Sequence, residues 1–381
     1  MRSFEEDVAL APHTTLGVGG PARYFVRCES EAELSEALAF ARARALPVLA
    51  LGGGSNLLVA DRGYDGVVIR VALRGVERSG DPERTLLHVA AGEPWDALVE
   101  RSVAWGLAGL ECLSGIPGDV GSTPIQNVGA YGQEVADTIA YVDAIDRASL
   151  EPRRFESAEC RFAYRDSAFK HELRGRYLIT AVGFALAGGA PTIAYPELVR
   201  ALANEEAPSL RLVRDTVVRL RRSKSMVLDP SDENHRSAGS FFTNPILDEA
   251  TVECVRAQVD LEGVLREGES MPTFRAGEGR LKLSAAWLIE RAGFSKGSSR
   301  GPVGISTRHS LALVNRGGAS AQQIVDFARW VRDGVERRFG VRLVPEPELV
   351  GFTADELGDL LGPARQSTGA ASPETKTRPR S

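Results

Sequence analysis

The sequence predicts a soluble protein of mixed α/β fold that binds a nucleotide. Short apolar runs typical of buried strands alternate with segments of helical spacing through the first half of the chain. Two glycine-rich stretches, 52–56 and 114–132, interrupt this alternation. Hydrophobic residues make up 43% and charged residues 25% of the 381 residues, which is typical of a globular protein.

Charge and residue usage exclude several classes of protein. With 46 basic and 51 acidic residues the net charge is −5, so we expect no nucleic-acid partner. No stretch reaches the roughly 18 apolar residues that span a membrane, and the N-terminus carries no secretion signal. Four scattered cysteines and five dispersed histidines predict free thiols and no metal site. We therefore expect a cytoplasmic protein without membrane insertion.

Three kinds of local signal define the elements of the first half. Ser30 and Glu33 form a capping box in front of apolar residues at helical spacing, which predicts a helix starting there. Apolar runs at 47–51 and 66–71 predict two buried strands. Pro94 opens a further helix, which ends at Gly106.

The second half follows a linker at 188–191 and contains two well-marked helices. The first covers 284–292 and is closed by Gly293. The second begins at Ser320 with Gln323 as capping-box partner, and ends at Phe339 before a glycine. About the last 20 residues are polar and are expected to be disordered.

The glycine-rich stretches are the first candidate binding site. The stretch 52–56 follows a strand, and its glycines can expose backbone N–H groups to an anion. It is neither a Walker A loop nor a dinucleotide fingerprint, because Leu57 stands where a third glycine is needed. The stretch 114–132 adds neutral donors and acceptors. Together they suit a dinucleotide with a polar ring system; a plain turn and structural loops are the alternatives.

Four polar segments are candidates for chemistry. Arg165, within 160–167, could grip a carboxylate or phosphate with its fork, although a surface arginine is the alternative. The basic residues at 221–224 suit a diphosphate or a solvated helix face. Ser240 lies between a glycine and two aromatics without a G-x-S-x-G elbow, so a hydrolase nucleophile is not expected. Glu346 and Glu348, two residues apart between prolines, point to the same side of an extended segment.

Taken in order, these segments resemble the UDP-N-acetylenolpyruvoylglucosamine reductase (MurB) family over about residues 14–351. The matching motifs are Thr15–Gly20, Leu51–Asn56, Ile116–Gly132, Cys160–Ser167, Ala238–Pro245 and Pro345–Glu346. The resemblance implies an α+β protein, with an FAD-binding fold of the vanillyl-alcohol-oxidase (PCMH) type in two lobes and a separate α/β substrate-binding domain after it. The implied parts are lobe 1 at 14–71, lobe 2 at 72–190, the substrate domain at 200–351 and a disordered tail at 352–381.

The resemblance also implies an activity and its cofactors. A member of this family is an NADPH-dependent UDP-N-acetylmuramate dehydrogenase with non-covalent FAD. It reduces UDP-N-acetylglucosamine enolpyruvate to UDP-N-acetylmuramate in peptidoglycan precursor synthesis. The implied FAD-binding residues are Gly52, Gly53, Gly54, Ser55, Asn56, Ser114, Ile116, Pro117, Gly118, Gly121, Ser122, Gln126, Asn127, Gly129, Ala130 and Tyr131. A monomer is expected, with the UDP-sugar and NADPH as small-molecule partners.

Further positions are implied by the same residue-by-residue match. The catalytic positions are Arg165, Ser240 and Glu346. Tyr195 matches a tyrosine that closes over the substrate in one of two subtypes, Lys224 and Asn244 match residues that hold the UDP diphosphate region, and Arg221 faces the flavin or its phosphates.

The chemistry of this reduction suggests a separate role for each of the three catalytic residues. Arg165 suits the negative charge that develops beside the substrate carboxylate. Glu346 is expected to be neutral, with a raised pKa, and to donate a hydrogen bond to the enolate. Ser240 is the candidate proton donor to the carbanionic carbon.

Two departures and two rival functions accompany this hypothesis. Where the family usually has Pro-Glu-Val, this chain has Pro-Glu-Pro-Glu, so Glu348 could compete with Glu346. The tail beyond Phe352 is outside the resemblance. An oxidase on the same flavin fold would share only the first half of the motifs. A catalytically silent flavin-binding protein would not need Arg165, Ser240 and Glu346 together.

Overall fold

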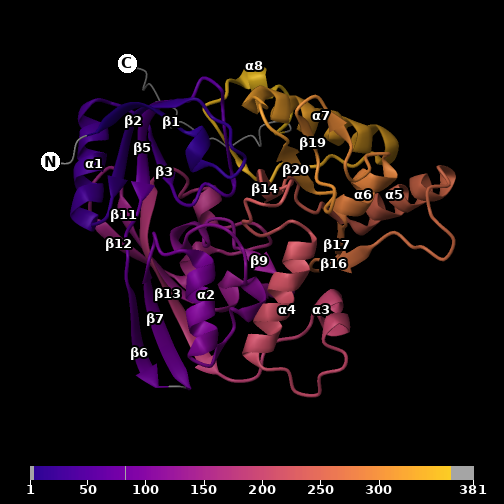
Figure 1. Ribbon diagram of the computed structural model, residues 1–381, viewed down its shortest axis with the longest axis horizontal. Coiled ribbons are helices and arrows are strands. Elements are labelled where there is room, and N and C mark those ends of the chain that lie inside the picture. The colour runs from indigo at the N-terminus through magenta and orange to yellow at the C-terminus, as the bar shows by residue number, and fades with distance from the viewer. Residues whose placement is uncertain (1–3, 82, 362–381) are drawn as a thin grey trace, which may run out of the picture.

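The computed structural model describes residues 4–81 and 83–361, which form two sheets packed together and a third part beside them (Figure 1). The first sheet has the order β1-β2-β5-β3, in which β2, β5 and β3 are parallel. Its strands and the helix that joins two of them are β1 (Glu5–Ala9), β2 (Pro21–Cys28), α1 (Glu31–Ala43), β3 (Val48–Leu51) and β5 (Tyr64–Val71).

The second sheet is antiparallel and has the order β12-β11-β13-β7-β6, with β8 paired to β13. Its strands are β6 (Val76–Asp81), β7 (Arg84–Ala90), β8 (Leu107–Ala108), β11 (Ile139–Asp146), β12 (Pro152–Glu156) and β13 (Tyr177–Gly188). One apolar core joins both sheets with α1 and with α2 (Trp95–Ala104). The two sheets therefore pack as one unit.

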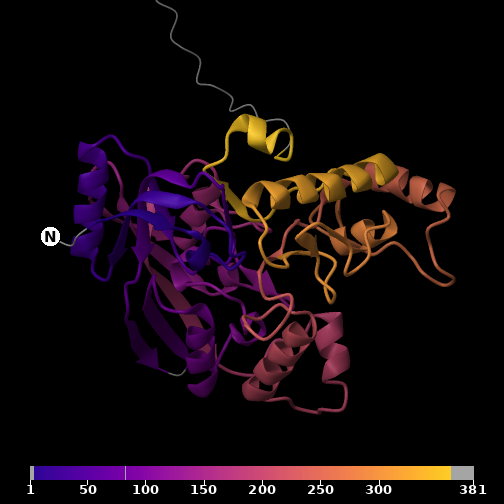
Figure 2. The same cartoon turned by 45° about the horizontal axis from the view of Figure 1, so that its top comes forward.

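The third part has its own core, over which α7 (Ala321–Phe339) lies along one side (Figure 2). Its main sheet has the order β14-β20-β19-β18, and a small sheet has the order β15-β17-β16. Its elements are β14 (Ser237–Ser240), β15 (Ile246–Asp248), α5 (Glu249–Leu261), β16 (Thr273–Arg275), β17 (Arg280–Leu283), α6 (Ala285–Arg291), β18 (Ser299–Arg300), β19 (Val303–Ile305) and β20 (Ala312–Asn315). Two helices precede it, α3 (Pro196–Ala201) and α4 (Leu210–Ser223).

The third part is tied to the first sheet region by a long-range pairing. Strand β21 (Glu348–Val350) runs parallel to β4 (Leu57–Val59), with Glu348 opposite Leu57. Leu16, Val18 and Leu58 from the first half are buried in the core of the third part. The pairing therefore brings the end of the folded chain back beside the first glycine-rich stretch.

The well-marked elements are confirmed, and several others lacked a signal. Helices α1, α2, α6 and α7 and strands β3 and β5 match the predicted segments within one or two residues. Helix α7 has the predicted capping box, and Gly340 closes it with φ +66°. Helices α4 and α5 were not predicted. The predicted domain boundaries remain predictions.

The predicted tail differs from the structure at its beginning. Residues 352–361 are described and include α8 (Ala354–Leu357), whose N-cap is Thr353. Leu360 is buried in the core of the third part, and Arg332 of α7 pairs with Asp359. These contacts hold the first ten residues of the segment expected to be disordered. Residues 362–381 lie outside the described residues.

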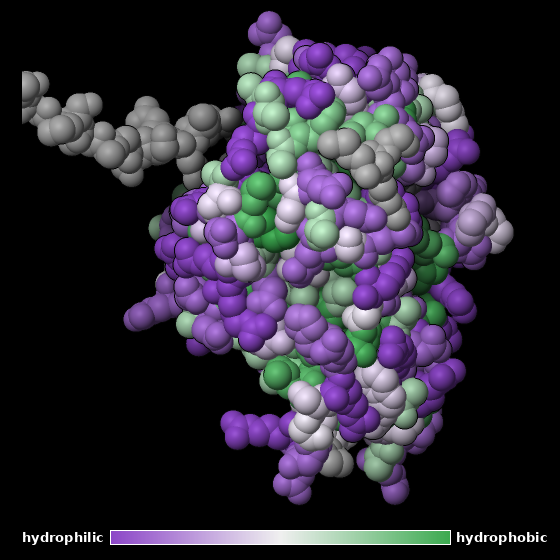
Figure 3. Space-filling view, turned by 90° about the vertical axis from the view of Figure 1, so that its left-hand side faces the viewer, coloured by the Kyte–Doolittle hydropathy of each residue, from purple (hydrophilic) through white to green (hydrophobic). Residues whose placement is uncertain are grey.

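None of the described helices is long and apolar enough to span a bilayer. The face shown in Figure 3, the left-hand side of Figure 1, is mainly hydrophilic, with small separate hydrophobic areas.

Replacing Ser320 with alanine should lower the free energy of unfolding by about 1 kcal/mol, because the Ser320 hydroxyl accepts a bond from the Gln323 amide at the start of α7. Urea unfolding followed by circular dichroism measures this change. Ser320→Asp keeps an acceptor at the cap and is the matched control. Equal loss in both variants would contradict the capping role.

Candidate active site

Three cavities adjoin one another, and the described lining of one of them comes wholly from the first half of the chain. We call them the long cleft, the side pocket and the end pocket. The long cleft lies along both glycine-rich stretches. The side pocket shares with it a wall that includes Asn56, Gln126 and Glu346, and reaches β14. The end pocket shares another part of the long cleft, including Gly52 and Ser122, but none of the residues of that wall.

The two glycine-rich stretches touch through their backbones. A Cβ on Gly53 would lie 2.8 Å from the Cα of Gly118, which is closer than real side chains approach. Gly54 has φ +64°, and a Cβ there would lie 1.9 Å from the carbonyl oxygen of His13. Ser55 donates to the carbonyl of Pro117 at 3.0 Å. The stretches thus form a cradle of closely packed backbone along the cleft, which fits the phosphates of a dinucleotide.

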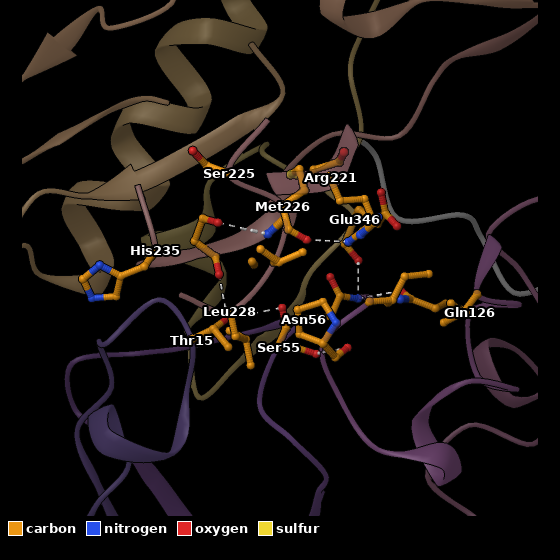
Figure 4. Close-up of a pocket in the computed structure, with 18 of the residues that line it drawn as sticks. Thr15, Ser55, Asn56, Gln126, Arg221, Ser225, Met226, Leu228, His235 and Glu346 are labelled. Carbon is orange, nitrogen blue, oxygen red and sulfur yellow. Dashed lines mark hydrogen bonds between the residues drawn. The ribbon is translucent and has the colours of Figure 1, made fainter. Parts of the chain in front are cut away.

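Asn56 connects the cradle to the end of the folded chain. Its Nδ2 donates to Gln126 Oε1 at 2.5 Å and to the carbonyl of Glu346 at 3.3 Å. The amide of Glu348 donates to the Asn56 carbonyl at 3.0 Å. Figure 4 shows these side chains converging on one wall.

Arg165 lines the side pocket, next to Glu346 on the wall that this pocket shares with the long cleft. Its backbone has φ +54°, in the left-handed region, within a tight turn in which Ala163 and Asp166 pair. Its Nη2 donates to the carbonyl of Gly129 at 2.7 Å, and its Nε lies 3.0 Å from Glu346 Oε1. The guanidinium is therefore held beside the Glu346 carboxylate.

Glu346 combines burial with a cationic neighbour. Only 12% of its side chain is exposed, and this burial raises the pKa of the carboxyl above its ordinary value. Arg165 and Lys170 act in the opposite direction without cancelling the effect of burial. A raised pKa favours the protonated form of Glu346, which can donate a hydrogen bond.

Glu348 differs from Glu346 in its surroundings. It is exposed and forms an ion pair with Arg174. It lines the long cleft but, among the described lining residues, is not part of the side pocket. The geometry therefore favours Glu346 over Glu348 as the group that meets Ser240.

Ser240 ends β14 and lines the side pocket together with Arg165 and Glu346. The next residue, Phe241, is buried, and its carbonyl accepts the amide of Glu346 at 2.8 Å. Phe242 forms an antiparallel bridge with Pro345. The backbone thus joins the segment of Ser240 directly to that of Glu346.

A second cluster lies next to the side pocket. The rings of Tyr131 and Tyr195 meet edge to face with centroids 5.4 Å apart. Lys224 lies 5.6 Å above the Tyr131 ring and pairs with Glu197 at 2.5 Å. Tyr195 is 43% exposed at the start of α3. The structure therefore brings Tyr195 and Lys224 together, outside the described lining of the three cavities.

The remaining predicted residues divide into lining and supporting groups. The lining group is Gly52, Gly54, Ser55, Asn56, Ile116, Pro117, Gly118, Gly121, Ser122, Gln126 and Gly129. Ser114 is buried and donates to the Glu111 carbonyl, and Asn127 is buried and bonds Glu134. Ala130 packs beside Tyr131. Asn244 accepts the amide of Ala285 at 2.9 Å, at the start of α6.

Arg221 lines the side pocket from α4. Its Nη2 donates to the Met226 carbonyl at 2.6 Å, and burial lowers its pKa to about 10. Among the described side chains its Nε has no hydrogen-bond partner.

Leu228 and His235 line the side pocket and Arg147 lines the long cleft, although no sequence motif marks these three residues. Leu228 and His235 follow the basic residues 221–224, and only the length of that loop signals a role. Among the described residues no group of three or more metal-ligand side chains converges.

The comparisons with protein families identify two matching regions. The family described as "FAD binding domain" matches residues 22–149. The family described as "UDP-N-acetylenolpyruvoylglucosamine reductase, C-terminal domain" matches residues 229–350. The first match contains both glycine-rich stretches, and the second contains Ser240 and Glu346.

Whole-length relatives agree with these matches. A UDP-N-acetylenolpyruvoylglucosamine reductase of Thermobifida fusca is 49% identical over 356 residues, covering 92% of this chain and 99% of the relative. One of Nocardia farcinica is 50% identical over 356 residues, covering 92% and 90%. The crystal structure of a UDP-N-acetylenolpyruvylglucosamine reductase (MurB) from Thermus caldophilus matches with a TM-score of 0.62 and 27% identity, covering 92% of this chain and 100% of that one. The predicted fold class is thereby confirmed.

Replacing Glu346 with glutamine should stabilise the protein relative to the wild type, and this advantage should grow as the pH rises. The raised pKa means that the folded state binds the proton more tightly than the unfolded chain, whose carboxyl has a pKa of about 4.3. Ionisation of Glu346 therefore lowers the stability of the wild type as the pH rises above about 4, whereas glutamine stays neutral.

The melting temperature of Glu346→Gln minus that of the wild type should thus increase between about pH 4.5 and pH 8. Glu348→Gln, at an exposed position, is the matched control. A difference that stays flat or falls over this range would show that burial does not govern Glu346.

Proposed function

This chain belongs to the UDP-N-acetylenolpyruvoylglucosamine reductase family, and from that premise we propose that it reduces UDP-N-acetylglucosamine enolpyruvate to UDP-N-acetylmuramate. The proposal assigns it to peptidoglycan precursor synthesis, with non-covalent FAD in the long cleft and NADPH as reductant. One observation carries the assignment of the site: Arg165, Ser240 and Glu346 line one pocket that opens on the long cleft.

The cradle of the glycine-rich stretches would hold FAD. Gly53 and Gly118 approach too closely for a side chain at Gly53, and backbone N–H groups of such glycine stretches would bind phosphate oxygens. The wall of Asn56 and Gln126 would meet the polar ring. When bound, FAD supplies the hydride chemistry; the protein supplies placement, charge and protons.

Arg165 would orient the carboxylate of the enolpyruvyl group. Its guanidinium keeps its charge and can bind two oxygens, so it stabilises the enolate formed when hydride reaches the methylene carbon. Its bond to the Gly129 carbonyl fixes its direction.

Glu346 would be neutral in the reactive complex and donate a hydrogen bond to the enolate oxygen. The raised pKa of its carboxyl supports this role, because an ionised carboxylate there would repel the developing charge. Its position beside Arg165 supports joint binding of the same substrate carboxyl group.

Ser240 would donate the proton to the carbanionic carbon. A hydroxyl is a weak acid, and it serves here because the carbanion is far more basic. Ser240 then recovers its proton from water. The shared pocket wall with Glu346 supports delivery to a carbon adjacent to the enolate oxygen.

Tyr195 and Lys224 would close over the UDP part of the substrate. Their contacts with Tyr131 and Glu197, next to the side pocket, support this assignment. Asn244, which accepts a hydrogen bond at the start of α6, would contact the diphosphate region of the same UDP group. Three buried free cysteines and one exposed free cysteine support a cytoplasmic location, and we propose a monomer.

An anaerobic visible spectrum tests the function. A flavin absorbance that bleaches with NADPH and returns with UDP-N-acetylglucosamine enolpyruvate supports both halves of the reaction. Bleaching without recovery would remove the substrate assignment, and absence of flavin after addition of FAD would remove the cofactor assignment.

Replacing Ser240 with alanine should leave bleaching by NADPH unchanged and slow recovery with the substrate by about 10²–10⁴-fold, since only the second half needs the proton. Stopped-flow absorbance separates the two rates. Ser237→Ala, on the same strand and pocket wall, is the matched control. Equal slowing of both halves would contradict the role of Ser240.

A further inference from the structure

Arg147 occupies the junction between the long cleft and the end pocket. It directly follows β11 of the second sheet, and its Nη1 donates to the carbonyl of Val48 in the first sheet at 3.0 Å. It lines both the long cleft and the end pocket. Its guanidinium therefore lies where the two sheets and two cavities meet.

The rest of this guanidinium has no partner in the part of the chain that the structure describes. Its Nε is buried without a hydrogen bond, and no described carboxylate pairs with it. The carboxylate of Asp146, the preceding residue, instead binds Arg176 at 3.0 Å and the amides of Ala148 and Ser149. The ionisable group that faces Arg147 is the Tyr64 hydroxyl.

The other cations of the long cleft are already engaged. Lys170 donates to the carbonyl of Arg165 at 2.9 Å, and Arg174 pairs with Glu348. A buried cation that lacks an anionic partner is costly unless a ligand supplies one or supplies hydrogen-bond acceptors. Of these three cations, Arg147 is the one with a buried donor, its Nε, that has no hydrogen-bond partner among the described residues.

The order of the cavities indicates which part of a ligand reaches Arg147. Glu346 lines the side pocket and the long cleft, whereas Arg147 lines the end pocket and the long cleft. Among the described lining residues, Glu346 is absent from the end pocket and Arg147 is absent from the side pocket. The reacting ring belongs beside Glu346. The opposite half of a dinucleotide therefore extends toward Arg147.

The end pocket suits a nucleoside. Its wall combines apolar side chains with small residues that expose backbone, among them Val71, Ala91, Gly121 and Ile179. A flat base can pack against such a wall, while phosphate, ribose and base present acceptors to a guanidinium.

We propose that Arg147 is a cofactor-binding residue that recognises the adenosine monophosphate half of FAD. The inference rests on the proposed function, because it takes FAD as the ligand of the long cleft. Arg147 bridges the two sheets through Val48 and turns its remaining donors to the acceptors of that half. Discrimination between FAD and FMN, which lacks adenosine monophosphate, then depends on this side chain.

The test is a titration of flavin-free protein with FAD and with FMN, followed by quenching of flavin fluorescence. In Arg147→Met the Kd for FAD should rise about tenfold or more, as for loss of hydrogen bonds to a charged group. The Kd for FMN should change less than about twofold, because FMN makes no contact there. Arg176→Met, in which an exposed arginine loses its Asp146 pair, is the matched control and should bind both flavins as the wild type does.

Unchanged FAD affinity in Arg147→Met overturns the inference, and so does an equal loss of affinity for FAD and FMN. If Arg147→Met does not fold, Arg147→Lys replaces it, with a smaller but still FAD-selective loss expected because lysine keeps the charge without the fork. Wild-type protein that binds no FAD would refute the proposed function itself. Wild-type binding combined with an unaffected variant refutes only the role of Arg147.

Discussion

The site depends on the parallel pairing of two short strands that are distant in sequence. Strand β21 pairs with β4, and the bonds of Asn56 to the segment of Glu346 and Glu348 extend that pairing to the cradle. Without it, Glu346 would not reach the wall that separates the side pocket from the long cleft. The burial of Leu58 in the core of the third part stabilises the same junction. The pairing of β21 with β4 therefore helps to place the cradle, Glu346 and the core of the third part relative to one another.

Within this frame, the electrostatics of the site rest on two opposing influences on Glu346. Burial favours its neutral form, and Arg165 at 3.0 Å favours the ionised form. Because burial is the larger influence, the carboxyl can serve as a hydrogen-bond donor beside a permanent cation. A substrate carboxylate on Arg165 would strengthen that tendency, because it adds negative charge next to Glu346. Arg165 would thus bind the substrate carboxylate at a position where its charge favours the protonated form of Glu346.

Elements with local signals could be predicted, and elements that depend on distant partners could not. The capping serine and closing glycine of α7 are encoded within its own ends, and the structure confirms that helix. Strand β13 is almost wholly buried and shows no alternation, so no local pattern marked it. In the site, ordered motifs indicated Arg165, Ser240 and Glu346. Arg147 stands in an ordinary turn, and only the packing of two sheets reveals that its Nε is buried at a cavity wall.

The pairing of β21 with β4 also bears on the biosynthesis of the protein. A ribosome adds roughly 290 residues between these strands, which takes about 15–60 s at usual rates of synthesis. In the part of that interval after residue 132 has been added, both glycine-rich stretches of the cradle exist without Glu346 and without the wall that this residue completes. Assembly of the pocket is therefore a late event, which follows release of almost the whole chain. A nonsense codon shortly before position 346 would leave both sheets encoded and still abolish the pocket.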